Sequence, residues 1–564
     1  MNIQLFLGCR LNRKFILGNK KQICKSAECT PPKWCRKYYD SETAKAVFFL
    51  YNESMQIYSD KCFKNPVKVI EADGDLECAI REIDELRKKY SLLGYITYDF
   101  KYLYFEAYDK YEKYSPSEAK QLGTIIKPMI TKEEYIRGVN KIKDYISEGV
   151  TYEVNYTYPS EVRTNLDGIE LYESLLGRQR TPYNAYIDNS RATLLSFSPE
   201  LFFKLEGRKI VTKPMKGTVP CLNDGKDEER RDFLYQDTKN LAENIMIVDL
   251  LRNDLGRIAK AGSVRVDKLF EIEKHPTVFQ MTSEVSAELD DNAGLYEIFK
   301  SIFPCGSITG APKVSTMRVI EELEPFSRNI YCGAIGFLSP KCAEFSVPIR
   351  ILYGKNHKYT YHSGGAIVWD STAEDEWEET ITKTKFIQTD FQLIETGIDD
   401  WESHLLRMQH SAAELGFKFH KPLIEGAKRI LLNKDGSFAI EEKSFSQVKS
   451  KKIKINRKVH SANPFLYHKT TIREQMPADV FDEIGVNERG EITEGTFTNI
   501  AVKINGKLFT PPVSCGLLAG TYREKLLKNG IMEEKILYLE DLEKAEKIFC
   551  FNSVRKLVEV ELCL

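Results

Sequence analysis

The sequence predicts a large α/β (α+β) protein made of two successive regions. From about residue 46 the chain alternates segments that have strand signals with segments that have helical periodicity. The composition changes at 388–392, and a second alternation of strands and helices then runs to the last residue. At roughly 150 residues per domain, a chain of this length allows about two to four structural units.

The first region contains most of the periodic segments. Helices are predicted at 76–89, 132–148, 228–255, 294–302, 312–323 and 371–388, the last beginning with a capping box at Ser371. Strands are predicted at 46–51, 95–98, 194–205, 331–338, 343–353 and 358–369. In the second region, helices are predicted at 401–415 and 520–529 and strands at 481–486 and 499–509.

Composition narrows the class of protein. The net charge is −1, so no overall field favours nucleic acid or an acidic membrane surface as a partner. No window approaches 18 apolar residues, and the N-terminus lacks the basic start and long apolar run of a signal peptide. The 13 cysteines are scattered, as expected for reduced thiols, and we expect a cytoplasmic protein. Residues 1–45 form an irregular segment without a motif.

Two predicted helices carry carboxylates at positions that favour a metal site. Glu243 lies beside the apolar stripe of the helix at 228–255 and would need a cationic partner. On the helix at 371–388, Glu376, Glu379 and Lys383 follow at i, i+3 and i+7 and share a face. Carboxylates that converge from two helices and leave room for water suit Mg²⁺. Taken alone, the pattern of each helix favours a solvated, salt-bridged face over a metal site by roughly four to one.

Other segments favour binding of an anion. Gly364 and Gly365 lie between strand signals, where the backbone can approach a ligand closely. The run from Phe303 to Lys313 is rich in turn residues and precedes a helix, whose N-terminus also suits a carboxylate. Arg350 lies within a strand signal and, if it faces inward, would pair with a carboxylate.

In their order, these motifs resemble the chorismate-utilising enzymes. The resemblance rests on the following runs: Ser198-Pro-Glu, Lys213-Pro-Met-Lys-Gly-Thr, 243–254, 303–313, Tyr331-Cys-Gly-Ala-Ile-Gly-Phe, Pro348-Ile-Arg and 364–383. It covers residues 46–390 and implies a large α/β sandwich of two antiparallel sheets that face each other, with helices outside.

The resemblance also implies roles for single residues. Glu243 and Glu379 would bind Mg²⁺, which holds the ring carboxylate of chorismate, and Glu200 would be the acid or base that helps the ring hydroxyl leave. The remaining substrate contacts would be Gly217, Thr218, Tyr331, Arg350, Gly364, Gly365 and Lys383.

The residue at position 216 distinguishes two branches of this family. Lys216 resembles the lysine of aminodeoxychorismate synthases, whereas anthranilate synthases carry alanine there. A lysine amine can add at carbon 2 and expel the hydroxyl at carbon 4, after which ammonia replaces the lysine. Because the amine must be neutral, burial or a nearby cation such as Lys213 is expected to lower its pKa.

Residues 391–564 resemble the class IV enzymes that use pyridoxal phosphate (PLP), and within them aminodeoxychorismate lyase. The resemblance rests on runs that begin at Phe391, His404, Phe465, Asn487, Gly516 and Asn552. It implies that Lys469 binds the cofactor aldehyde and Glu494 pairs with the ring nitrogen. The phosphate contacts implied are Arg407, Thr521 and Ser553.

Three departures from the family patterns stand out. Gln280 replaces a histidine and cannot carry a proton at neutral pH. Ala366 replaces a glycine, which requires ordinary backbone angles at that position. Residues 391–564 are fewer than a full class IV enzyme has, and the shortfall falls between Arg407 and Lys469.

The hypothesis that these patterns favour is a bifunctional enzyme of 4-aminobenzoate, and hence folate, synthesis. It would aminate chorismate to 4-amino-4-deoxychorismate and then eliminate pyruvate. No glutamine-amidotransferase motif is found, so a separate subunit would supply ammonia. Two alternatives remain open: an anthranilate or isochorismate/salicylate synthase, and a synthase whose C-terminal region is a non-catalytic module.

Overall fold

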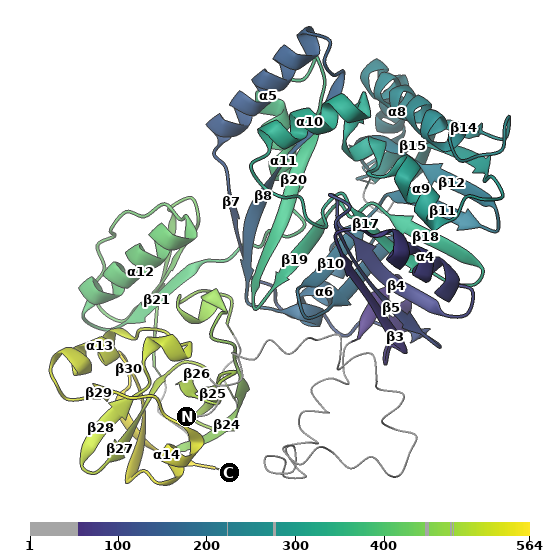
Figure 1. The fold of residues 1–564 in the computed structure, drawn as a ribbon. Helices are drawn as coiled ribbons and strands as arrows, with labels where there is room; N and C mark the ends of the chain where they lie inside the picture. Colours follow the sequence, from purple (N-terminus) through teal and green to yellow (C-terminus); the bar gives the residue numbers. More distant parts are fainter. Residues whose placement is uncertain are drawn as a thin grey trace, which may run out of the picture. The chain divides into compact units, whose positions relative to one another are not determined.

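The structure, a computed structural model, describes residues 55–222, 224–274, 278–445, 450–473, 477 and 479–563. The strand predicted at 46–51 and the irregular segment at 1–45 lie outside these ranges. Figure 1 shows the described chain coloured from purple through teal and green to yellow. Within the described ranges, no helix is long and apolar enough to cross a membrane.

The first sheet has ten strands that pair antiparallel. Across the sheet they are β16 (Gly310–Ala311), β8 (Glu153–Thr164), β20 (Lys358–Ile367), β19 (Ile351–Lys355), β10 (Thr193–Ser198), β9 (Tyr183–Asp188), β1 (Gln56–Tyr58), β2 (Lys61–Phe63) and β6 (Glu112–Lys113), with β7 (Thr124–Pro128) also paired to β8.

The second sheet also has ten strands, again paired antiparallel. Their order is β13 (Met215–Pro220), β15 (Val278–Glu288), β12 (Lys209–Lys213), β11 (Leu201–Glu206), β18 (Cys342–Ser346), β17 (Ala334–Leu338), β4 (Ser91–Ile96), β5 (Tyr102–Tyr108) and β3 (Lys68–Asp73), with β14 (Arg265–Lys274) also paired to β15.

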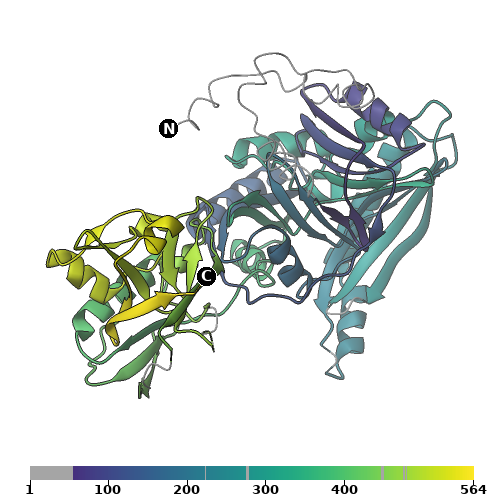
Figure 2. The same ribbon diagram turned by 90° about the horizontal axis from the view of Figure 1, so that it is seen from below.

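Aromatic side chains pack between the two sheets and on their outer faces. Tyr58 of β1 stacks on Phe337 of β17, which joins the sheets across the core, with ring centroids 5.7 Å apart. On the outer face of the second sheet, Phe299 packs against Phe203 and Phe345. Successive strand residues point to opposite faces, so one strand can contribute side chains both to the core between the sheets and to the packing on the outer face. The prediction of two facing antiparallel sheets is therefore confirmed (Figures 1 and 2).

Helices cover the outer faces of this sandwich. The helix α5 begins after a complete capping box of Thr131 and Glu134, and it packs with α11 on β8 and β20. The helix α8 follows Asp237, whose side chain accepts from the backbone N–H of Lys239, and it contacts β13, β15 and β16. The helices of this region are α4 (Glu77–Leu86), α5 (Lys132–Ser147), α6 (Gly168–Leu176), α7 (Asp227–Gln236), α8 (Thr238–Gly256), α9 (Leu295–Ile302), α10 (Lys313–Leu323) and α11 (Ala373–Thr382).

The C-terminal region has a small sheet and a larger one. The small sheet is β21 (Leu393–Gly397), β22 (Lys428–Leu432) and β23 (Phe438–Glu442), on which α12 (Trp401–Leu415) packs. The larger sheet is β26 (Ile492–Gly495), β25 (Asp482–Val486), β24 (Lys452–Lys458), β31 (Lys556–Leu562), β30 (Lys547–Asn552), β27 (Asn499–Ile504), β28 (Lys507–Thr510) and β29 (Glu533–Glu534), accompanied by α13 (Thr521–Lys528) and α14 (Leu539–Glu543).

Some predicted elements are divided in the structure. The strand predicted at 194–205 is two strands separated at Pro199, which has no N–H for a sheet ladder. The helix predicted at 228–255 is two helices that meet at Asp237, where ψ is 105° and therefore not helical. The helix predicted at 371–388 is capped by Thr372 instead of Ser371, whose hydroxyl donates to Glu376. The domain boundary predicted between 390 and 391 stays a prediction.

Candidate active sites

Lys216 lies on β13 at the edge of the second sheet, and only 8% of its surface is exposed. Its Nζ donates to Oε1 of Glu153 at 2.5 Å and lies 3.9 Å from Oε2 of Glu243. Glu153 opens β8 of the first sheet, and Glu243 lies on α8. The amine therefore meets carboxylates from two other elements, in a position that water does not reach freely.

Glu153 is the residue that the sequence analysis missed. It is fully buried, and its Oε2 atom has no hydrogen-bond partner among the described residues. A buried carboxylate is costly unless a cation or a ligand compensates its charge. The available signal was a single acidic residue at the start of a strand segment in which aromatic residues alternate with other residue types, from Tyr152 to Tyr158.

The expectation of a lowered lysine pKa is wrong for the free protein. Burial acts to lower the pKa of Lys216, but the charges of Glu153 and Glu243 outweigh burial and raise it above its ordinary value. Lys213, the cation expected nearby, is instead paired with Glu273. The lysine of the resting site is therefore an ammonium ion that must lose a proton before it can act as a nucleophile.

Three glutamates meet near Lys216 on the facing helices. Glu243 and Glu376 are buried, and burial raises the pKa of both carboxyl groups. The charge of Glu376 contributes to the raised pKa of Glu243, and Glu379 on α11 pairs with Lys383 at 2.8 Å. The described residues contain no cluster of three metal-binding side chains. Two carboxylates with substrate and water as the other ligands still suit Mg²⁺, because it usually keeps several waters.

The glycines predicted on β20 lie against these carboxylates. A Cβ atom at Gly365 would come within 2.8 Å of Oε2 of Glu376, and one at Gly364 would come within 2.2 Å of a backbone carbonyl. Lys383 donates to the carbonyl of Gly364 at 2.7 Å. Ala366, where relatives have glycine, is not among the positive-φ positions, so its methyl group meets the expected condition. The structure thus brings Gly364, Gly365, Glu379 and Lys383 together.

Tyr331 and Arg350 are two more of the predicted substrate contacts. Tyr331 is buried and stacks on His362, with ring centroids 4.9 Å apart. Arg350 has a φ of 54°, a strained value for a side chain of this size, and no hydrogen bond or ion pair of its guanidinium is found among the described residues. Burial lowers the pKa of Arg350. An unpaired guanidinium of this kind suits an incoming carboxylate.

Gly217 and Thr218 follow Lys216 on β13 and are fixed by Gln280 of the neighbouring strand. The amide of Gln280 donates to the carbonyl of Gly217 at 2.8 Å and accepts from the hydroxyl of Thr218 at 2.7 Å. Gly217 has a φ of 75°, and a Cβ atom there would come within 2.8 Å of Asn240. The residue that replaces the family histidine therefore braces the predicted substrate loop.

Glu200 is buried just before β11. Its Oε1 accepts a hydrogen bond of 2.5 Å from Ser307, which lies in the turn-rich run before α10. Burial raises the pKa of Glu200 to about 7, against the lowering effects of the Ser307 hydrogen bond and the charge of Lys216. A carboxyl group with this pKa can both give and take a proton near neutral pH.

In the C-terminal region, Lys469 and Arg407 share one buried carboxylate. Arg407 donates to both oxygens of Glu395, and the ammonium of Lys469 lies 3.8 Å from the same side chain. Burial lowers the pKa of Lys469 to about 8, although the charge of Glu395 opposes this. About a tenth of this amine is neutral at pH 7, which suits a lysine that attacks an aldehyde.

The other predicted cofactor contacts line the same pocket as Lys469. Glu494 accepts from the side chain of Asn499 and the backbone N–H of Leu518, and burial raises its pKa to about 7. Thr521 opens α13 with its backbone N–H groups unpaired within the helix, and Ser553 lies at the rim. An amine, a carboxyl group and a helix N-terminus match the aldehyde, ring nitrogen and phosphate of PLP.

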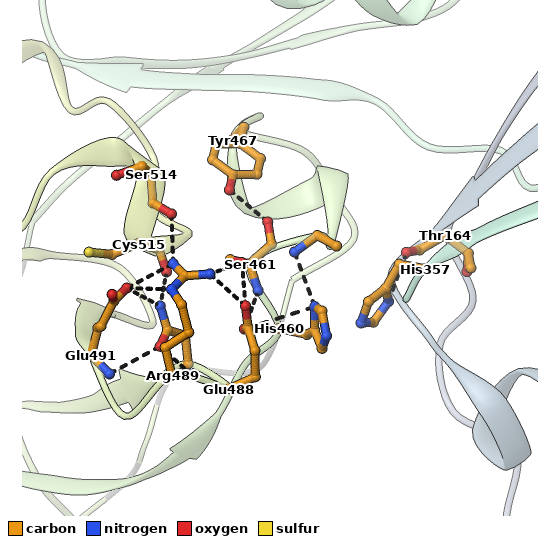
Figure 3. A network of polar contacts seen from close by, with 12 residues as sticks. Thr164, His357, His460, Ser461, Tyr467, Glu488, Arg489, Glu491, Ser514 and Cys515 are labelled. Atoms are coloured by element: carbon orange, nitrogen blue, oxygen red, sulfur yellow. Dashed lines mark hydrogen bonds and ion pairs between the residues drawn. The ribbon is translucent and has the colours of Figure 1, made fainter. Parts of the chain in front are cut away.

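The charged residues that precede Glu494 in its motif have structural partners (Figure 3). Arg489 pairs with Glu488 and Glu491 at 2.7 Å each and donates to the carbonyl of Ser514. Asn487 donates to Glu491 and to the carbonyl of Cys515. These contacts hold the turn between β25 and β26 and leave Glu494 as the acid that faces the pocket.

Comparison with known families identifies both regions. Residues 105–389 match the model of the chorismate binding enzyme family, which is half of the chain. The chain belongs to the chorismate binding enzymes. Residues 439–563 of this chorismate binding enzyme match the model of the class IV amino-transferases.

Curated relatives and solved structures agree with this placement. The chain is 36% identical over 308 residues to aminodeoxychorismate synthase component 1 of Escherichia coli, covering 54% of this chain and 67% of that protein. It is 35% identical over 267 residues to anthranilate synthase component 1 of Aquifex aeolicus, covering 47% and 54%. Anthranilate synthase component I of Streptococcus pneumoniae matches the fold at 22% identity, with a TM-score of 0.53 over 60% of this chain and 93% of that one.

Proposed function

We propose that this chorismate binding enzyme makes 4-aminobenzoate in two steps. The first region aminates chorismate at carbon 4, and the second eliminates pyruvate from the product. The observation that carries the proposal is the buried amine of Lys216, held 2.5 Å from Glu153 and 3.9 Å from Glu243. An amination through a covalent lysine adduct needs such an amine. The 36% identity to aminodeoxychorismate synthase component 1 supports the same branch of the family.

In the first step, Lys216 would act as a nucleophile that is later displaced. Its amine adds to carbon 2 of chorismate, the two conjugated ring double bonds both shift, and the hydroxyl leaves carbon 4 as water after it takes a proton from Glu200. Glu153 is the nearest carboxylate to the proton that Lys216 must lose. Ammonia then adds at carbon 4, both double bonds shift back, and the lysine amine leaves carbon 2. The product is 4-amino-4-deoxychorismate.

Glu243 and Glu379 would hold Mg²⁺ in this site. The metal would neutralise the ring carboxylate of chorismate. Arg350, whose guanidinium has no described partner, would bind the carboxylate of the enolpyruvyl side chain together with Tyr331. Gly217 and Thr218, braced by Gln280, would border the substrate beside Lys216.

Ammonia would come from a separate glutamine amidotransferase subunit. The sequence carries no nucleophile turn of such an enzyme, and several relatives carry names that end in component 1. If the purified chain alone used glutamine as well as ammonium, this part of the proposal would be withdrawn.

The cytoplasm is the proposed location of the enzyme. The exposed Cys78 and the buried Cys305 are free thiols. Free thiols are typical of a reducing compartment.

In the second step, Lys469 would bind the aldehyde of PLP and later move a proton from carbon 4 of the substrate. When bound, PLP would withdraw electrons from that carbon. Glu494 would pair with the ring nitrogen, and the N-terminus of α13 at Thr521, with Ser553 and Arg407, would hold the phosphate. Loss of pyruvate then gives the aromatic ring of 4-aminobenzoate.

Analysis of the end products tests the proposal directly. With chorismate, Mg²⁺ and ammonium, we expect 4-amino-4-deoxychorismate without PLP and 4-aminobenzoate plus pyruvate with PLP. Anthranilate or isochorismate as the main product would refute the role given to Lys216. Accumulation of 4-amino-4-deoxychorismate in the presence of PLP would show that the C-terminal region is a non-catalytic module.

The pKa of Glu200 predicts how amination depends on pH. Only the protonated acid can assist departure of the hydroxyl, so the rate should fall as pH rises through about 7. The Ser307 hydrogen bond lowers the pKa of Glu200, so Ser307→Ala should move this fall to higher pH. Ser315→Ala, at an exposed serine on α10, is the matched control. A Ser307→Ala profile identical to that of the wild type would contradict the assignment.

A further inference from the structure

Three cationic side chains line the cofactor pocket of the C-terminal region: Arg407, Lys469 and Arg473. Arg407 is neutralised by two hydrogen bonds to Glu395 and donates a third to the carbonyl of Ala519. Lys469 lies near the same carboxylate. For Arg473, no hydrogen bond or ion pair is found among the residues that the structure describes. Within the described ranges, this positive charge of the pocket therefore has no hydrogen-bonded or ion-paired partner.

An unpaired guanidinium in a pocket indicates an anion that is still to bind. Burial lowers the pKa of Arg473, while the charge of Glu494 acts in the opposite direction. A guanidinium nevertheless stays protonated at neutral pH. Removing such a charge from water costs free energy, and an anionic ligand that binds to it recovers much of this cost. The planar fork of N–H groups matches a carboxylate, which it can bind through two parallel hydrogen bonds.

The aldehyde, ring nitrogen and phosphate of PLP already have other candidate partners in this pocket. Lys469 suits the aldehyde, Glu494 the ring nitrogen, and the N-terminus of α13 with Ser553 the phosphate. Arg473 follows Lys469 by four residues, a reach of at most about 14 Å, and the two charges influence each other. Within this upper limit, the pocket that both side chains line can accommodate a six-membered ring whose amine reacts at the Lys469 end and whose carboxylate lies at the opposite end.

We propose that Arg473 binds the ring carboxylate of the substrate and fixes the orientation of its amine toward the cofactor. The inference rests on the function proposed for the C-terminal region. It adds to that function a residue that distinguishes a 4-amino carboxylic acid from an amine without a carboxylate. Because no hydrogen bond or ion pair of Arg473 is found among the described residues, its replacement leaves none of their groups unpaired, and the variant is expected to fold.

The test compares two probes on the full-length chain loaded with PLP: 4-aminobenzoate, and aniline, which lacks the carboxylate. Calorimetry gives the affinity of each probe, and the visible band of the bound cofactor gives the affinity for PLP. In Arg473→Gln we expect 4-aminobenzoate to bind about 10- to 100-fold more weakly, the loss typical of a charge-assisted hydrogen-bonded pair. Aniline and PLP should bind as in the wild type. Arg473→Lys, which keeps the charge but not the fork, should fall in between.

Arg555→Gln is the matched control, since Arg555 stacks on Phe497 near the pocket without lining it. It should bind both probes as the wild type does. Unchanged 4-aminobenzoate affinity in Arg473→Gln would overturn the proposal. So would a parallel loss of PLP affinity, which would assign Arg473 to the cofactor. A separate measurement tests the proposed function itself. If the wild-type chain binds PLP but releases no pyruvate from 4-amino-4-deoxychorismate, the proposed function is wrong.

Discussion

Lys216→Ala is expected to abolish formation of 4-amino-4-deoxychorismate. Without the amine, amination at carbon 4 has no covalent route, and we expect a loss of roughly 1000-fold in rate, equivalent to about 4 kcal/mol of transition-state stabilisation. Any remaining turnover should give a different product, because ammonia can still enter the site. Product analysis with chorismate, Mg²⁺ and ammonium measures both effects. Unchanged output of 4-amino-4-deoxychorismate would rule out the covalent mechanism.

Two controls separate this chemical effect from a loss of folding. The alanine variant leaves Glu153 buried without its cation, which costs about 3–5 kcal/mol when one partner of a buried pair is removed. The double variant Lys216→Met with Glu153→Gln removes both charges, so it should regain stability and remain inactive. Lys213→Ala changes a partly exposed lysine of the same run, paired with Glu273, and should keep most of the activity.

Lys469→Ala is expected to stop the pathway at its intermediate. The chain should no longer hold PLP covalently, the visible band of the bound cofactor should disappear, and formation of 4-aminobenzoate should fall by roughly 1000-fold or more. The first region should continue to work, so 4-amino-4-deoxychorismate should accumulate. Absorbance spectra and product analysis on one preparation measure both effects. Persistence of the band and of 4-aminobenzoate formation would remove Lys469 from the proposed role.

The control for this variant is a lysine that is charged but distant from the pocket. Lys507 on β28 is exposed and pairs with Glu533 at 2.9 Å. Lys507→Ala should leave the cofactor band and both products unchanged. A comparable loss in this control would point to general damage of the C-terminal region.

Much of the fold could be predicted from local patterns. The helices α5, α9, α10 and α12 begin and end within two residues of their predicted bounds, because their apolar spacing and caps are local signals. Breaks between neighbouring elements were harder to predict. The division between α7 and α8 at Asp237 depends on a single capping residue inside one continuous helical pattern.

Site residues could be predicted where they belong to a sequence motif. Residues that reach the site from a distant part of the chain could not. Lys216 could be identified from its own run, whereas Glu153 lies 63 residues away and meets it only because the edges of two sheets face each other. The direction of the lysine pKa was wrong for the same reason. Arg473 lies only four residues after Lys469 in the sequence. That it has no partner among the described residues is visible only in the structure.

Gln280 affects how many groups contribute to the pH dependence of amination. Its amide fixes the shape of the loop at Gly217 and Thr218 through two hydrogen bonds, and an amide neither gains nor loses a proton between pH 4 and 10, roughly the range of most assays. A histidine in its place would change charge near neutrality and alter the loop with it. In this enzyme the residue that braces the substrate loop carries no titrating group, so the loop adds no titration of its own to the fall of the rate that Glu200 would cause near neutral pH.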